Sequence, residues 1–586
     1  MKQLLNSPVN QLEERLLVHL ENVYPMYDIR ALAQQLINTF NLHKVCKDPL
    51  RHHNNWAETD ILTITYGDTI RDPAERPLRT LHNFLNTWLA DTVNWVHILP
   101  FYPYSSDDGF SVINYKQVNE DLGDWDDIRA IADDYKLMAD LVINHCSSRS
   151  EWFEQFRRNE LPGKDFFIEA DPLDDHSAVV RPRTTPLLRE VETLDGTRYV
   201  WCTFSPDQVD LNFANPAVLL EMADIIRFYM EAGISVFRLD AVAFLWKEPG
   251  TNCLNLFQTH EIIRILRALI EHCNPHAIII TETNIPNREN LAYFGNANEA
   301  HIIYNFSLPP LLVHALVSGE NRYLNNWLMS MPPAQDGTTY LNFIASHDGI
   351  GLRPVEGILS EEERDQLIST MRSFGGLVSW REAGGQRQPY EINISLFDAF
   401  AGTTEGRDSY QFERFICAHI IMLGLEGVPA FYIHSLLGTE NDLRKVELSG
   451  NNRAINRHIW DKSVLTDKLR DPVSHHHLVL HRLKKIVRLR KQQAAFHPNS
   501  TQYTLHLGEG IFAFWRQNRT RSQSIFCIHN LTASEVALPL NSLNLVETQE
   551  WFDIFSGETV ADFAAQKTLA PYQCLWLSNR DFSDAQ

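Results

Sequence analysis

The stretch VFRLDAV, residues 236–242, places an arginine and an aspartate two positions apart at the end of an apolar run. The preceding residues, 219–233, have the periodicity of an amphipathic helix that ends at a glycine, and residues 234–239 are typical of a short buried strand. Side chains two apart in a strand share a face, so we expect Arg238 and Asp240 to point the same way. Such a charged pair on a buried face is either a structural ion pair or part of a functional site.

Seven more runs of strand length occur along the chain, and helical patterns separate most of them. The eight predicted strands cover residues 61–66, 95–99, 137–143, 234–239, 277–281, 302–306, 340–345 and 429–433. The predicted helices cover residues 78–90, 125–134, 217–231, 256–273 and 410–423. Eight successive βα units predict an α/β protein built on a closed parallel (β/α)8 TIM barrel, whose catalytic groups lie at the C-terminal ends of the strands.

The chain of 586 residues is too long for one compact core. We expect an N-terminal helical extension at residues 1–55 and a catalytic barrel at residues 56–145 and 217–498. Residues 146–216 are too long for a simple crossover and predict an inserted subdomain over the barrel mouth. Short alternating strands near residues 502–507, 510–515, 524–529, 547–553 and 573–577 predict an antiparallel β domain at residues 499–586.

Composition excludes several classes of partner. A net charge of −22 argues against a nucleic acid or an anionic membrane as partner. The eight cysteines are scattered without CxxC spacing, as in a protein with reduced thiols. Residues 1–20 mix polar residues with leucines, unlike a signal peptide, and no run of 18 apolar residues occurs. We therefore expect a cytoplasmic enzyme.

Polar residues follow directly on four of the predicted strands, where a barrel places its catalytic mouth. One such residue is usually a satisfied buried polar group, but four groups together indicate a site. The third strand ends in residues 140–145, which include Asp140, Asn144 and His145, and the fourth ends in Arg238 and Asp240. The fifth ends in Glu282, and the seventh in His347 and Asp348.

Three carboxylates in one mouth are typical of a glycosidase. Two acids about 5 to 5.5 Å apart cleave a glycosidic bond with retention, one as nucleophile and one as acid/base. We expect Asp240 to be the nucleophile, held ionised by Arg238, and Glu282, which has no adjacent basic residue, to be the protonated acid. Asp348 would then grip the sugar hydroxyls and stabilise developing positive charge, with His145 and His347 as neutral hydrogen-bonding groups.

These segments resemble the four signature regions of the α-amylase family of retaining glycosidases. FYPYSSDDGF at residues 101–110, RPR at 181–183, LPPLL at 308–312, HDGIG at 347–351 and AINR at 454–457 resemble, more narrowly, the sucrose phosphorylase group. The resemblance implies that Asp240, Glu282 and Asp348 are nucleophile, acid/base and stabiliser. It also implies glucose-binding roles for Asp107, His145, Arg238, His347 and Arg457, and phosphate-binding roles for Arg183 and Tyr390. A cation and a hydroxyl donor would help phosphate to compete with water.

The acceptor side departs from the sucrose enzymes. Glu391 stands where they carry a glutamine, and TNIP at residues 283–286 replaces their His-Ser-Tyr pattern. The loop at residues 332–338 resembles the family's acceptor loop and offers Gln335 rather than a cation. We therefore expect Gln335 and Glu391 to contact a neutral polyol such as glycerol, with glycerate as the second choice. Arg353 could supply a cation for glycerate.

The function expected is that of a retaining α-glucoside phosphorylase, a hexosyltransferase. It would convert a small glucoside, best glucosylglycerol, and phosphate reversibly to α-glucose 1-phosphate and the free acceptor by double displacement. Glucosylglycerate, sucrose and sucrose 6'-phosphate are alternative substrates; a hydrolase or transglucosylase and a non-catalytic barrel are alternative functions. The mechanism needs inorganic phosphate as co-substrate and no metal or organic cofactor, although Asn144 and residues 171–175 carry possible calcium ligands. The protein could be a monomer or a homodimer.

Overall fold

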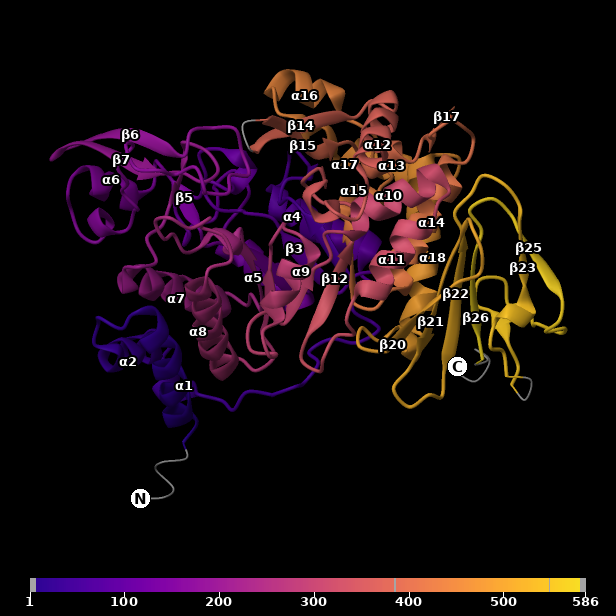
Figure 1. Cartoon of the computed structure of the whole chain (residues 1–586), viewed down its shortest axis with the longest axis horizontal. Helices are drawn as coiled ribbons and strands as arrows, with labels where there is room; N and C mark the ends of the chain where they lie inside the picture. The colour runs from indigo at the N-terminus through magenta and orange to yellow at the C-terminus, as the bar shows by residue number, and fades with distance from the viewer. Residues whose placement is uncertain (1–6, 384–385, 547–548, 580–586) are drawn as a thin grey trace.

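The computed structural model describes residues 7–383, 386–546 and 549–579 (Figure 1). Its centre is a closed barrel of eight parallel strands in the order β1-β18-β12-β11-β10-β9-β4-β3. The strands are β1 (Leu62–Thr65), β3 (Trp95–Ile98), β4 (Lys136–Val142), β9 (Val236–Asp240), β10 (Ile278–Thr281), β11 (Ile302–Tyr304), β12 (Thr339–Phe343) and β18 (Val428–Tyr432). Each of the eight predicted strands overlaps one of them, with bounds that differ by at most two residues at either end, so the predicted (β/α)8 barrel is confirmed.

Helices connect the strands on the outside of the barrel. The five predicted helices are present as α4 (Pro77–Phe84), which continues into a π-helical turn at Leu85–Leu89, α5 (Trp125–Asp134), α7 (Pro216–Glu231), α8 (Phe257–Cys273) and α14 (Gln411–Gly424). The helix α7 begins where the Asn215 side chain accepts a hydrogen bond from the amide of Ala217, with proline in the first turn. It ends just before Gly233, whose φ of +94° favours glycine.

Among the described residues of the barrel, five helices of nine residues or more had no predicted counterpart: α10 (Leu308–Ser318), α11 (Arg322–Ser330), α12 (Glu361–Ser373), α17 (Lys462–Arg470) and α18 (His475–Lys491). The helix α10 shows why. Prolines occupy its second and third positions, where a helix tolerates them, and all its residues from Leu308 to Val317 are buried. A helix that is buried on every side has no polar stripe, so its sequence lacks the amphipathic period that marks a helix.

Two excursions rise above the C-terminal ends of the barrel strands. The first contains α6 (Glu151–Arg157), the hairpin of β6 (Leu188–Thr193) and β7 (Gly196–Trp201), and the pair β5 (His145–Ser147) and β8 (Gln208–Asp210). The second is the hairpin of β14 (Leu377–Ala383) and β15 (Gln386–Asn393), which β13 (Ile350–Gly351) extends. Figure 1 shows both along the upper side of the view.

Elements at the two ends of the chain pack against the barrel. The helix α1 (Pro8–Val23), followed by α2 (Ile29–Thr39) and α3 (Leu42–Val45), contacts α8, where the side-chain amide of Asn22 donates to Glu261 at 3.0 Å. The C-terminal part holds an antiparallel sheet in the order β20-β21-β22-β26-β24 and a separate pair, β23 with β25. These strands are β20 (Thr501–Leu505), β21 (Ile511–Gln517), β22 (Ser524–Asn530), β23 (Val536–Pro539), β24 (Phe552–Asp553), β25 (Gln566–Leu569) and β26 (Cys574–Ser578). Residues 1–6 of the expected extension, 547–548 of the expected fourth strand and 580–586 of the expected β domain lie outside the described residues.

Two further expectations concern the whole chain. All eight cysteines are free thiols, as their spacing indicates. Within residues 7–383, 386–546 and 549–579, no helix combines the length and the apolar composition that crossing a bilayer requires.

Candidate active site

Two acidic residues stand side by side where neighbouring strands end. The register of β9 with β10 pairs Leu239 with Thr281, so Asp240 and Glu282 follow as the next residues on adjacent strands, which lie about 4.8 Å apart. A Glu282 carboxylate oxygen accepts a hydrogen bond of 3.0 Å from the backbone amide of Ala241. Ala241 has a φ of +52°, a conformation that non-glycine residues rarely adopt and that is often found at active sites.

Arg238 holds Asp240 in place through a buried network on three neighbouring strands. Its Nη1 donates to Asp240 Oδ1 at 2.7 Å and to Asp140 Oδ1 at 2.5 Å. The second oxygen of Asp140 lies 2.7 Å from Nε2 of His97 on β3. The predicted common face of Arg238 and Asp240 is therefore present. Asp140 belongs to the segment at residues 140–145 that the sequence singles out, whereas His97 was not predicted. His97 could have been suspected because it follows the inward period of β3.

Burial changes the protonation of the two facing acids. Burial raises the pKa of Asp240 well above its usual range, and the charge of Glu282 adds to this, whereas Arg238 opposes it. Arg238 thus lowers the pKa of Asp240, as expected from the sequence, but burial outweighs this effect and the net shift is upward. Burial also raises the pKa of Glu282. The pair retains a proton at a pH where an isolated carboxyl has lost it.

The position of that proton follows from the hydrogen bonds. Asp240 accepts from the Arg238 guanidinium at 2.7 Å, a contact that favours the charged form. Glu282 accepts only from a neutral backbone amide among the described residues. The negative charge therefore belongs on Asp240 and the proton on Glu282, an arrangement suited to nucleophilic attack by the first and acid catalysis by the second.

Asp348 lies among cations at the end of β12. Nη1 of Arg453 is 2.5 Å from Asp348 Oδ1, and Nη2 of Arg457 is 3.8 Å from the same oxygen. Burial alone would raise the pKa of Asp348, but Arg453 and Arg457 outweigh it and the pKa is lowered. His347 lies beside it, and burial together with Arg457 holds its pKa well below the usual range. Asp348 is therefore charged and His347 neutral.

Arg453 is a site residue that the sequence analysis missed. It also donates from Nε and Nη2 to the two carboxylate oxygens of Glu391, at 2.8 and 2.9 Å. Glu391 is only 1% exposed and accepts a third hydrogen bond from Asn393 at 2.9 Å. Because these bonds occupy its carboxylate, Glu391 acts on the site through Arg453. The motif at residues 454–457 begins one position after Arg453, so extending it by one residue would have found this arginine.

The predicted glucose-binding residues converge on one wall of the mouth. Asp107 Oδ2 accepts from the Gln208 side chain at 3.1 Å, and His145 Nε2 lies 3.0 Å from the carbonyl oxygen of Phe110. Arg457 donates from Nε to the carbonyl oxygen of His347 at 2.8 Å, and its Nη1 pairs with Asp108. Burial lowers the pKa of His145, so this histidine is neutral, as expected.

A sharp turn aims Asp107 and Asp108 into this wall. Both aspartates have positive φ, +54° and +48°, and Gly109 follows with a φ of +112°. A Cβ at position 109 would lie 2.8 Å from the carbonyl oxygen of Pro100, so only glycine fits there.

The predicted phosphate-binding residues come from the two excursions. Arg183, on the first, has Nη2 3.8 Å from Asp107 Oδ2, which brings it to the glucose-binding wall. Tyr390, on β15, is half-buried, and burial together with the charge of Glu391 raises its pKa. Tyr390 is therefore a protonated hydroxyl that can donate a hydrogen bond. The Arg183 guanidinium acts on the pKa of Tyr390, and among the described residues its one ion pair is the 3.8 Å contact with Asp107.

The structure does not bring Gln335 to the site. The loop at residues 332–338 precedes β12 and lies at the N-terminal end of the barrel, opposite the mouth. The carbonyl oxygen of Gln335 accepts from Asn499 at 3.2 Å, and Gly337 donates to Asn54 at 2.7 Å. The expectation that Gln335 contacts the acceptor is wrong, because a segment that enters a parallel strand lies at the end opposite to the residues that follow it.

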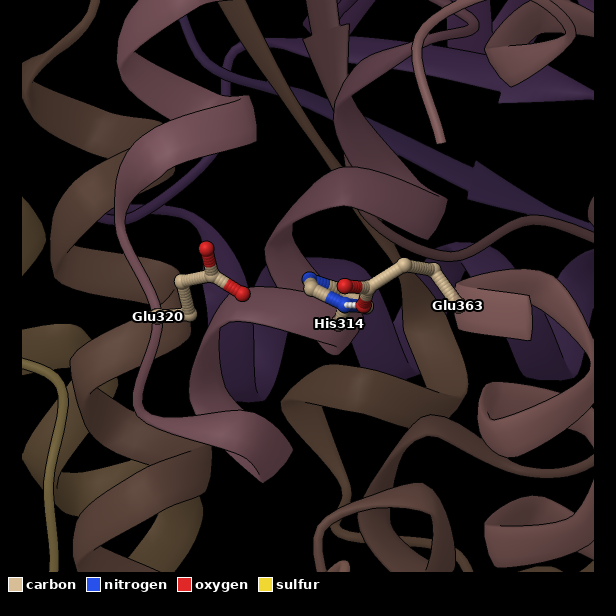
Figure 2. Close-up of side chains that lie close together, drawn as sticks. All are labelled: His314, Glu320 and Glu363. Carbon is tan, nitrogen blue, oxygen red and sulfur yellow. Dashed lines mark hydrogen bonds and ion pairs between the residues drawn. The ribbon is translucent and has the colours of Figure 1, made fainter. Parts of the chain in front are cut away.

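Two groups of side chains were considered as cation sites. Asn144, a possible calcium ligand, instead accepts from Lys247 Nζ at 2.7 Å, and the same ammonium lies 2.6 Å from the buried Asp210. Figure 2 shows the one cluster of metal-ligand type found among the described residues, His314, Glu320 and Glu363. His314 lies on the helix α10, and Arg322 neutralises the two acids, at 2.8 Å from Glu320 and 3.8 Å from Glu363.

Comparisons with known proteins agree with this geometry. The model of the α-amylase catalytic domain matches residues 91–349. A glucosylglycerate phosphorylase of Spirochaeta thermophila is 41% identical over 528 residues, which cover 89% of this chain and 90% of that protein. A glucosylglycerol phosphorylase of Marinobacter adhaerens is 30% identical over 433 residues, 72% of this chain and 85% of that protein. The crystal structure of sucrose 6F-phosphate phosphorylase from Thermoanaerobacter thermosaccharolyticum superimposes with a TM-score of 0.71 at 21% identity, over 88% of this chain and 98% of that one, a likeness of fold.

Proposed function

Because the chain belongs to the α-amylase family and, within it, to the sucrose phosphorylase-like group, we propose that it is a retaining glucosylglycerate phosphorylase. It would convert an α-glucosylglycerate and inorganic phosphate reversibly to α-glucose 1-phosphate and glycerate. The observation that carries the acceptor is the 41% identity to a glucosylglycerate phosphorylase over nine-tenths of both chains, against 30% over a shorter match to a glucosylglycerol phosphorylase.

The choice of glycerate replaces the glycerol expected from the sequence. That expectation rested on the lack of a cation in the loop at residues 332–338, and this loop lies at the far end of the barrel. The segments that follow β12 and β18 contain several arginines, among them Arg353 and Arg381 after β12 and Arg453 after β18. An anionic acceptor is compatible with such a surface.

The first chemical step breaks the glycosidic bond. The Asp240 carboxylate attacks the anomeric carbon while Glu282 gives its proton to the glycosidic oxygen, and glycerate leaves with that oxygen. Arg238 orients Asp240, and Asp348, kept charged by Arg453, faces the positive charge that develops on the sugar ring. The product is a glucosyl ester of Asp240 with inverted anomeric configuration.

The second step transfers the glucosyl group to phosphate. A phosphate oxygen attacks the anomeric carbon, Glu282 takes up the phosphate proton, and the bond to Asp240 breaks, so the second inversion gives net retention. Phosphate must compete with water at this point. The Arg183 guanidinium and the Tyr390 hydroxyl would favour it by binding its oxygens. Phosphate is the one co-substrate that the mechanism requires.

The proposal is tested by following α-glucose 1-phosphate and free glucose separately, with glucosylglycerate as substrate. We expect glucose 1-phosphate to form only with phosphate and Arg183→Ala to raise the KM for phosphate roughly 10-fold or more. Arg198→Ala is the matched control, because Arg198 lies on the same excursion with an exposed side chain. Release of free glucose at a rate that phosphate does not change would identify a hydrolase and reject the proposal.

The eight free thiols support a further part of the proposal, that the enzyme acts in the reducing environment of the cytoplasm.

A further inference from the structure

Arg353 lies beside the proposed phosphate-binding tyrosine, on the segment that leaves the catalytic strand β12. The pairing of β13 with β15 places Ile350 opposite Ile392 and Gly351 opposite Glu391. One residue further, the amide of Leu352 donates to the carbonyl oxygen of Tyr390 at 3.0 Å. Arg353 follows directly and begins the 3-10 helix η6 (Arg353–Val355). Its backbone is therefore fixed relative to both Asp348 and Tyr390.

The charge of Arg353 is uncompensated, unlike that of its neighbours. Four other arginines along this side of the mouth are ion-paired at distances of 2.8 Å or less: Arg238 with Asp140 and Asp240, Arg381 with Glu356, Arg453 with Asp348 and Glu391, and Arg457 with Asp108. Arg183 lies 3.8 Å from Asp107. Within residues 7–383, 386–546 and 549–579, no hydrogen bond or ion pair involves the guanidinium of Arg353, which is half-buried.

The surroundings of Arg353 agree with an unfilled anion site. Burial and the nearby charge of Arg381 lower the pKa of Arg353, although Tyr390 and Glu356 oppose this. A cation that is partly removed from water gains most from an anion that binds it directly.

A second polar side chain near Gly351, that of Asn284, also indicates an acceptor site. Asn284 lies two residues beyond Glu282, the group that protonates the departing acceptor in the proposed mechanism. Its Oδ1 is buried and has no hydrogen-bond partner among the residues that the structure describes. Asn284 packs against Gly351, where an added Cβ would be 3.2 Å from Nδ2. Asn284, Gly351 and Asp348 line one cavity. Gly351 therefore contacts Asn284, and Arg353 follows Gly351 by two residues on the same segment.

We infer that Arg353 is the residue that selects an anionic acceptor, its guanidinium pairing with the carboxylate of glycerate while Asn284 contacts the same acceptor. This inference rests on the proposed function. Glycerate differs from glycerol by a carboxylate in place of a hydroxymethyl group, and a planar guanidinium binds a carboxylate through two parallel N–H bonds. Arg183 and Tyr390 would bind phosphate, so glycerate and phosphate are recognised by different arginines.

The test compares acceptors in the synthetic direction, with α-glucose 1-phosphate as donor and either glycerate or glycerol as acceptor. In Arg353→Gln, kcat/KM for glycerate is expected to fall roughly 10- to 100-fold, the effect of losing hydrogen bonds to a charged group, while kcat/KM for glycerol changes less than about threefold. Arg353→Lys keeps the positive charge but lacks the planar guanidinium, so its kcat/KM for glycerate should lie between those of the wild type and Arg353→Gln. Arg372→Gln, with an exposed arginine in the last turn of α12, is the control for loss of one positive charge.

The outcomes separate this inference from the proposed function. A wild-type enzyme that uses glycerol but not glycerate would reject the proposed function itself. A wild-type enzyme that uses glycerate, with Arg353→Gln losing glycerate and glycerol activity equally or losing only affinity for phosphate, would overturn the inference alone. If Arg353→Gln lowers Tm, the same comparison is made with Arg353→Lys. Equal loss of kcat/KM for glycerate and glycerol in Arg353→Lys would also overturn the inference.

Discussion

Replacing Arg453 by methionine removes the cation that joins two buried acids. Methionine has a comparable length and no charge, so the variant tests charge more than volume. In the native protein Nη1 of Arg453 is 2.5 Å from Asp348, and Nε and Nη2 bond both oxygens of Glu391. After the change Glu391, which is 1% exposed, keeps only its hydrogen bond from Asn393.

The structure gives the expected size of the effect. Removing one partner of a buried ion pair costs about 3–5 kcal/mol because the other charge is left without compensation. Arg453→Met is therefore expected to lower the free energy of unfolding by about 3–5 kcal/mol. Adding Glu391→Gln removes the uncompensated charge, and the double variant should recover about 2 kcal/mol of this. Activity should not recover, because Asp348 still lacks its nearest cation.

The loss of stability should also depend on pH. Without Arg453, burial raises the folded-state pKa of Glu391 above its unfolded value, so the folded state binds the proton more tightly. Stability is then retained below the unfolded pKa and lost as pH rises through the folded pKa. Arg453→Met is therefore expected to be more destabilising at pH 8 than at pH 5.

The assay is urea unfolding, followed by tryptophan fluorescence, of the wild type, the two single variants and the double variant. Phosphorolysis rates are measured on the same samples. The four unfolding free energies form a double-mutant cycle. Additivity of the two single changes within about 0.5 kcal/mol would refute the argument that Arg453 and Glu391 stabilise one another, and wild-type activity in Arg453→Met would refute the role given to Arg453 beside Asp348.

Three more predictions address other parts of the molecule. Glu282→Gln should lower the rate of phosphorolysis of glucosylglycerate about 10²- to 10⁴-fold. The rate with α-glucosyl fluoride should fall less, because fluoride leaves without a proton. Equal losses with the two substrates in steady-state assays would contradict the acid role of Glu282. Lys247→Met should lower Tm, because it leaves the buried Asp210 unpaired, and Asp210→Asn in the same chain should restore part of the loss; no restoration would argue against the pairing. Burial raises the pKa of Glu426 to about 7, so its carboxylate destabilises the fold progressively as pH rises from about 4.5 to above 7. Glu426→Gln should therefore raise Tm more at pH 8.5 than at pH 5, and an equal change at both would disprove the shift.

The sequence predicts those features that depend on short-range periodicity. Eight buried strands are visible as local apolar runs, and the residues that follow them, such as Asp240 and Glu282, meet because parallel strands end together. Arg453 could not be found in this way, since its contact with Glu391 spans 62 positions and no local period links them. The expectation for Gln335 is wrong for a different reason. Its loop resembles an acceptor loop, but in the predicted barrel a loop that precedes a strand lies opposite the mouth.

The wall of the mouth that contains Asp108 and Arg457 joins residues that are synthesised far apart in time. Arg457 pairs with Asp108 across 349 positions, and the barrel itself closes only when β18 pairs with β1. During translation, the early barrel strands have an unpaired edge until residue 432 has left the ribosome. The wall of the mouth stays incomplete until residue 457 has also been synthesised. Nascent chains released before that point would carry both reacting acids and yet have no complete place to hold a sugar.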